Sequence, residues 1–166
     1  SALQACLAEV AEKYGPVAAF IYLEPTGEND PSGVRFSELE KSLVKLAFLA
    51  AKHLKGSINQ AAALGRSVFM TVTRLDGAFG LGEDGDYTPV IGGLFGLVKT
   101  LNLEWDAVFC RAVDLSPALS VDRAVDCILA ELCDPNRLIT EVGYTLDERS
   151  TLALMEEPQT AASNAA

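Results

Sequence analysis

The chain has 166 residues, enough for one domain with a sizeable core. Apolar residues make up 49% of it and charged residues 22%, which is typical of a globular protein. The formal net charge of −10 at pH 7 argues against nucleic acid and anionic membranes as partners, because both are polyanions. The simplest interpretation of this charge is an acidic surface on a soluble domain.

The composition also bears on compartment and on metal chemistry. Ser1–Tyr14 lacks the basic start and unbroken apolar run of a signal peptide, and no stretch approaches the roughly 20 apolar residues that cross a bilayer. No two cysteines have CxxC spacing, and all four lie within apolar or helical patterns. They are therefore expected to be buried free thiols, which suits the cytoplasm: Cys6, Cys110, Cys127 and Cys133. With His53 as the only histidine, neither a zinc site nor a histidine-based triad is expected.

The first third of the chain predicts two helices around one strand. Ala2–Lys13 has helical apolar spacing, and Val17–Leu23 is a continuous apolar run typical of a strand buried on both faces. Ser37 is the predicted N-cap of a helix that ends near Leu54. The expected inner face of this helix is Leu39, Leu43, Leu46, Leu49 and Ala50. Gly56 separates it from a second helical piece, Ile58–Leu64.

Strands and helices then alternate along the rest of the chain. In order, the expected elements are a strand at Ser67–Thr73, a helix at Pro89–Glu104, a strand at Phe109–Leu115, a helix at Val121–Leu132 and a strand at Ile139–Leu146, which Arg149–Leu154 extends or pairs with. The helix at Val121–Leu132 is expected to face inward through Val121, Ala124, Val125, Ile128 and Leu132. Residues 155–166 are small, polar and unpatterned, as in a disordered linker or tail.

This alternation predicts the fold class. Right-handed βαβ crossovers give an α/β fold with a parallel sheet of about four strands, flanked by helices. Residues 1–154 are expected to form this single unit, since no repeat or composition break divides them.

One glycine-rich segment formally matches a nucleotide-binding motif. Gly80 to Gly85 reads G-x-G-x-x-G after a strand, but Glu83, Asp84 and Asp86 would repel a pyrophosphate. The next helix also begins too late for its N-terminus to meet the phosphates. We therefore interpret the segment as an acidic loop. Three further glycines inside the next helix are expected to permit close helix–sheet packing: Gly92, Gly93 and Gly96.

The segment Tyr87–Trp105, YTPVIGGLFGLVKTLNLEW, resembles the active-site helix of short-chain dehydrogenases, which opens with Tyr-x-x-x-Lys. Here Ile91 stands at the lysine position. The preceding strand, in RSVFMTVTRLDG, resembles the one that carries the family's catalytic serine, but offers only Thr73 and Arg74. The resemblance assigns proton transfer to the tyrosine and pKa lowering to the lysine, so Tyr87 would keep a pKa near 10 and be a poor catalyst. Tyr87, Arg74 and Ile91 are therefore expected to be vestigial positions.

A closer resemblance is to the ketoreductase region of polyunsaturated fatty acid synthases and related iterative polyketide synthases. It rests on three blocks in order, AKHLKGSINQAAALGRSVFMTVTRLDGAFG, GGLFGLVKTLNLEWDAVFCRAVDL and LITEVGYTLDERSTLAL. It implies a truncated Rossmann-like structural subdomain without catalytic, cofactor or metal ligands of its own. NADPH is then expected in a partner catalytic subdomain, which reduces β-ketoacyl groups on an acyl carrier protein. The missing glycine-rich first β–α unit agrees with this expectation.

Two other functions remain open at this stage. One is a minimal reductase that uses Tyr87 with a lysine from elsewhere. The other is a binding module of flavodoxin type, whose ligand would lie beyond the carboxyl ends of the strands. Glu24, Asp76 and Asp114 make that edge acidic, which disfavours phosphate ligands and leaves cations or sugars.

Overall fold

The computed structural model describes residues 2–25, 37–82 and 89–153. Tyr87, the three acidic residues Glu83, Asp84 and Asp86 of the glycine-rich segment, and the expected tail at 155–166 lie outside these residues. The elements are α1 (Ala2–Tyr14), β1 (Ala19–Leu23), α2 (Glu38–Ala62), β2 (Val68–Thr73), α3 (Gly92–Glu104), β3 (Phe109–Leu115), α4 (Val121–Cys133), β4 (Glu141–Tyr144) and β5 (Arg149–Ser150).

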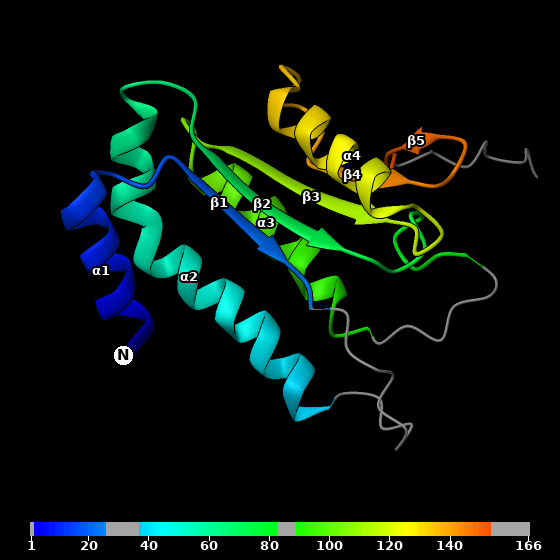
Figure 1. The fold of residues 1–166 in the computed structure, drawn as a ribbon, viewed down its shortest axis with the longest axis horizontal. Coiled ribbons are helices and arrows are strands. Elements are labelled where there is room, and N and C mark those ends of the chain that lie inside the picture. Colours follow the sequence, from blue (N-terminus) through cyan, green and yellow to red (C-terminus); the bar gives the residue numbers. More distant parts are fainter. Residues whose placement is uncertain (1, 26–36, 83–88, 154–166) are drawn as a thin grey trace, which may run out of the picture.

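The strands form one sheet in the order β1-β2-β3-β4-β5. The first four strands pair in parallel and β5 pairs antiparallel to β4, which confirms the predicted α/β class and the pairing of the segment that begins at Arg149. Helices cover both faces, with α4 on the face opposite α3 (Figure 1). The sheet therefore separates the core into two layers, one between each face and the helices that cover it.

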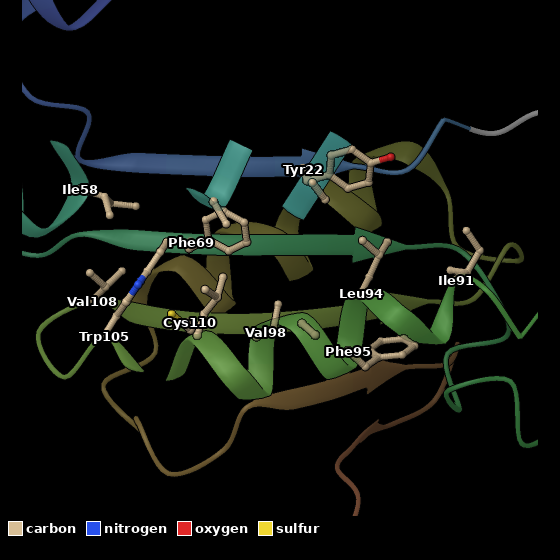
Figure 2. Close-up of a cluster of buried hydrophobic side chains, with 14 of the residues drawn as sticks. Tyr22, Ile58, Phe69, Ile91, Leu94, Phe95, Val98, Trp105, Val108 and Cys110 are labelled. Carbon is tan, nitrogen blue, oxygen red and sulfur yellow. The ribbon is translucent and has the colours of Figure 1, made fainter. Parts of the chain in front are cut away.

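The larger core layer lies between the sheet and helices α2 and α3. Figure 2 shows Phe69 of β2 at its centre, with Trp105 following α3. The Phe69 ring stacks on Phe20 at 5.2 Å between centroids and meets Trp105 edge-on at 5.7 Å. The opposite layer joins β2, β3 and β4 to α4 through residues such as Met70 and Val113. Alternate residues of each central strand thus enter opposite layers.

Local capping explains where α2 begins. The Ser37 hydroxyl accepts a hydrogen bond from the Glu40 amide at 3.2 Å, and the Glu40 carboxylate accepts one from the Ser37 amide at 2.9 Å. This capping box confirms the predicted N-cap. The predicted break at Gly56 is wrong, because α2 continues through it to Ala62 and the space beside Gly56 is open.

The buried face of α2 also differs from the prediction. Leu39 and Leu46 are exposed, and of the five predicted inner residues only Ala50 is fully buried. The face against the core is instead Ala47, Ala50, Ala51, Leu54, Ile58 and Ala61. Small alanines let α2 lie close to the aromatic layer, which the larger leucines would prevent.

Strand β1 is not buried on both faces, contrary to the prediction. It forms one end of the sheet, and only Tyr22 in it is fully buried. Ile21 and Leu23 point to the other side and are exposed, because the helix on that side, α4, contacts β3 rather than β1. A continuous apolar run therefore does not distinguish an edge strand from a central one.

Helix α4 and two of the cysteines correct the remaining burial predictions. Val121 and Val125 are exposed, whereas the buried face of α4 is Ala124, Cys127 and Glu131. Cys110 and Cys127 are buried free thiols as predicted, but Cys6 and Cys133 are exposed. Glu131 can lie on that buried face because it forms ion pairs with Arg111 and Arg149.

Candidate functional site

Ligands of open parallel sheets bind beyond the carboxyl ends of the strands. In this chain that edge contains the ends of β1, β2 and β3 and the loop 75–82 that follows β2. The predicted vestigial positions Arg74 and Ile91 come directly after β2 and directly before α3. Tyr87 lies outside the described residues, so its position relative to them stays a prediction.

The residues at the serine region make structural contacts. The Arg74 guanidinium donates to the carbonyl oxygens of Pro117 and Leu119, each at 3.1 Å, and so braces the loop between β3 and α4. The Thr73 hydroxyl is buried and donates to the Asp114 carboxylate at 2.9 Å. Both polar groups of this segment are therefore occupied by the chain itself.

Ile91, at the lysine position, is buried in the larger core layer. It is only 2% exposed and belongs to the same apolar cluster as Leu94 and Phe95 (Figure 2). An ammonium group there would lose its hydration without gaining a described acidic partner, which is costly. The environment of this position thus suits an aliphatic side chain.

Asp114, the penultimate residue of β3, organises the loop after β2. One carboxylate oxygen accepts hydrogen bonds from the Thr73 hydroxyl and the Leu75 amide, and the other accepts from the amides of Gly77 and Phe79, all at 2.9 Å. Its side chain is completely buried. Burial raises the pKa of Asp114, and the donated hydrogen bonds oppose that rise.

Asp76 holds the next turn of the same loop. Its carboxylate accepts from the amides of Ala78 at 2.7 Å and of Gly80 and Gly82 at 2.8 Å each. Although partial burial alone would raise the pKa of Asp76, these three hydrogen bonds lower it. Gly80 and Gly82 begin the apparent nucleotide motif, and their amides already bind an internal carboxylate. A phosphate would have to displace Asp76 to reach them.

The loop 75–82 packs closely against the sheet. Gly77 has φ +76°, and a β-carbon on it would collide with the carbonyl group of Tyr144. A β-carbon on Gly143 would in turn collide with the Gly77 carbonyl. The Phe79 ring meets Phe95 of α3 edge-on at 5.9 Å. The loop therefore lies against the ends of β3 and β4 and fills this part of the edge with the chain's own atoms.

Negative charge dominates the same edge. Glu24 is close enough to Asp114 for their charges to interact, and burial followed by this repulsion raises the pKa of Glu24, against a hydrogen bond from the Arg74 backbone. Together with Asp76, these carboxylates form the acidic edge that the sequence indicated. Such an edge repels phosphates and carboxylates.

A second polar cluster, which the sequence did not reveal, lies under α4. Arg111 in the middle of β3 is completely buried and pairs with Glu131 at 3.2 Å and Asp134 at 2.9 Å. Arg149 binds the same two carboxylates at 2.7 and 3.0 Å, and the Tyr144 hydroxyl donates to Glu131 at 2.5 Å. The two positive and two negative charges balance, so the cluster joins β3, α4, β4 and β5 as a structural unit. The only signal in the sequence was Arg111 itself, a charged residue in the middle of a mainly apolar strand that also contains Asp114.

Neither a membrane span nor a metal cluster is found in the described parts of the chain. No helix there is long and apolar enough to cross a bilayer. Within the same residues, no three His, Cys, Asp or Glu side chains gather as metal ligands.

Comparison with known proteins identifies one homologous segment. No protein-family model matches the chain. One of the subunits of the polyunsaturated fatty acid synthase of Thraustochytrium sp. is 33% identical over 114 residues, covering 65% of this chain. The chain spans only 4% of the length of that synthase protein.

Solved structures of short-chain dehydrogenases share the fold. One from Mycobacterium smegmatis has a TM-score of 0.54 at 15% identity, covering 80% of this chain and 59% of that one. A putative short-chain dehydrogenase/reductase from Burkholderia xenovorans has a TM-score of 0.53 at 16% identity, covering 78% and 52%. The chain is thus homologous to part of a polyunsaturated fatty acid synthase and has the Rossmann-like α/β fold of short-chain dehydrogenases.

Proposed function

We propose that this chain is the non-catalytic structural subdomain of a ketoreductase in a polyunsaturated fatty acid synthase or a related polyketide synthase. Its role is to stabilise a catalytic subdomain, which binds NADPH and reduces β-ketoacyl groups on acyl carrier protein. The homology to part of a synthase and the dehydrogenase-like fold support a ketoreductase-related role. The two buried and two exposed free thiols suit a cytoplasmic protein.

The observation that carries the proposal is the closed loop 75–82. Two carboxylates, Asp114 and Asp76, take up its amides, and Gly77 seats it against β4. A dinucleotide needs free amides and an accessible strand edge. The described residues at this edge therefore do not fit NADPH.

The buried isoleucine gives independent support. A catalytic tyrosine in this fold depends on a nearby cation to lower its pKa, and Ile91 supplies an apolar side chain in an apolar layer. Arg74, the cation of the serine region, is held by the carbonyls of Pro117 and Leu119. The alternative, a minimal reductase based on Tyr87, would need a cation from another part of the protein.

Calorimetric titration of the 166-residue chain with NADPH tests the proposal directly. We expect no binding at micromolar concentrations, and saturable micromolar binding would overturn the scaffold role. In the whole synthase, Tyr87→Phe is expected to leave β-keto reduction unchanged. Loss of reduction in a variant that still folds would instead support the reductase alternative.

A further inference from the structure

An open groove runs between the outward faces of α2 and α3. It has a volume of about 540 Å³ and apolar walls formed by Val44, Phe48 and Leu97. Phe48 is 54% exposed, although it is a large aromatic residue on a helix that already has a separate buried face. The groove therefore presents apolar surface that the described part of the chain leaves uncovered.

Glycines keep this groove open on the α3 side. A β-carbon on Gly93 would lie 3.3 Å from a methyl group of Val44 in α2, whereas one on Gly96 would meet nothing within 4 Å. The prediction that these glycines pack against the sheet is thus wrong, because they face outward and toward α2. A face without side chains allows another helix to approach the α3 backbone closely.

Lysines follow the α2 side of the groove. Lys41, Lys45, Lys52 and Lys55 lie at helical spacings that keep them on one face, together with Phe48. After Glu40, α2 contains no acidic residue. We call these four residues the lysine stripe. Lys41 and Lys45 line the groove itself, and Lys52 and Lys55 continue the stripe along the same face of α2.

The central lysines of the stripe are available for a partner. Lys41 pairs with Glu38 at 2.7 Å and Lys55 with Glu104 at 3.6 Å. Among the described residues, no ion pair involves Lys45 or Lys52. The chain has a net charge of −10, whereas this local surface is positive. It therefore favours a negatively charged partner.

These observations combine into one binding mode, which rests on the proposed function. We infer that the α2–α3 groove docks an acidic amphipathic helix of the catalytic ketoreductase subdomain. Its apolar stripe fills the space beside Phe48, Leu97 and Gly96, and its flanking carboxylates meet the lysine stripe. A second copy of this chain fits less well, because α2 after Glu40 and α3 before Glu104 contain no acidic residue that could meet the lysine stripe.

Fluorescence anisotropy of a labelled peptide with the 166-residue chain tests the chemistry of the groove. The probe is a synthetic amphipathic helix with leucines along one face and glutamates on both flanks; a second peptide has lysines on the flanks. We expect saturable binding of the glutamate peptide only, weakened by salt. Absence of saturable binding, or equal binding of both peptides, overturns the inference.

Matched variants separate charge from shape. Lys45→Glu combined with Lys52→Glu is expected to weaken glutamate-peptide binding at least about tenfold, or about 1.4 kcal/mol. Lys13→Glu, which makes a charge reversal on α1, should leave binding unchanged. Gly96→Leu fills the groove in open space and should abolish binding while the lysines remain. Unchanged binding in either groove variant contradicts the inference, provided that circular dichroism shows a folded chain.

Co-purification of the chain with the separately expressed catalytic subdomain distinguishes this inference from the proposed function. Association that survives both groove variants refutes the docking site but leaves the scaffold role intact. Failure of the unaltered chain to associate refutes the scaffold role itself. A dimer of the chain in analytical ultracentrifugation that disappears with Gly96→Leu would assign the groove to a second copy and overturn the inference.

Discussion

Replacement of Asp114 by asparagine tests whether one buried carboxylate holds the loop over the strand ends. Each Asp114 oxygen accepts two hydrogen bonds, so the four donors need both oxygens. Asparagine has one carbonyl oxygen. In its better orientation, the new NH₂ group faces Thr73, whose hydroxyl can rotate and accept, and only the Leu75 amide loses its acceptor.

The magnitude follows from these contacts. One buried donor without an acceptor costs about 1–3 kcal/mol. Burial disfavours the charged form of Asp114, as its raised pKa indicates, so replacing the carboxylate with a neutral amide offsets part of that cost. We therefore expect Asp114→Asn to lower the free energy of unfolding by about 1–3 kcal/mol, and Asp114→Ala by more, because all four donors are then left.

Urea denaturation gives the stability change, and amide hydrogen exchange locates it. Protection of the Leu75 amide should fall most in Asp114→Asn, since it alone loses its acceptor, whereas the Gly77 and Phe79 amides keep the carbonyl oxygen of the asparagine. Asp76→Asn is the matched control, because its carboxylate binds a more exposed turn and should cost less. A larger loss in Asp76→Asn, or unchanged exchange in Asp114→Asn, would refute the proposed role of Asp114.

Three further predictions concern stability, each measured by urea denaturation. Gly56→Ala should stabilise the chain by about 0.5–1 kcal/mol, since Gly56 lies inside α2 and has open space beside it. Gly77→Ala should instead destabilise the chain strongly, because the new β-carbon would collide with the Tyr144 carbonyl. Equal effects of the two substitutions would contradict the structure. Glu131→Gln should lower the free energy of unfolding by about 3–5 kcal/mol, because two arginines and a tyrosine lose a buried carboxylate. Asp134→Asn should lower it by less, because the Asp134 side chain is 19% exposed, and the reverse order would disprove this ranking. Burial and the hydrogen bond to Glu131 raise the pKa of Tyr144 from 10 to about 12. The folded state therefore holds the phenol proton more tightly than the unfolded state, and stability should fall as pH rises from about 10 to about 12. Tyr144→Phe should lack this fall, and the same pH dependence in both proteins would refute the contribution of Tyr144.

Local sequence signals determined the order and type of the elements. The strand Phe109–Leu115 has the predicted bounds, and the Ser37 cap begins α2 as its Ser-x-x-Glu pattern indicates. These features depend on neighbouring residues only: a capping box closes within one turn, and an apolar run between turn residues favours an extended chain. The acidic character of the strand-end edge was also predictable, because the residues that end each parallel strand meet there.

Only the tertiary structure decided which faces of the elements are buried and what the polar residues do. Periodicity shows that a helix has an apolar side, but the neighbouring aromatic layer selected the alanines of α2 over Leu39 and Leu46. Likewise, the position of β1 at the end of the sheet exposed a strand whose composition suits a buried one. The partners of Asp114 on β2 and of Arg111 on α4 are distant in sequence, so no local pattern could join them. Side chains from separate elements share an environment only once the chain has folded, and the closed loop and the lysine-lined groove both arise from that convergence.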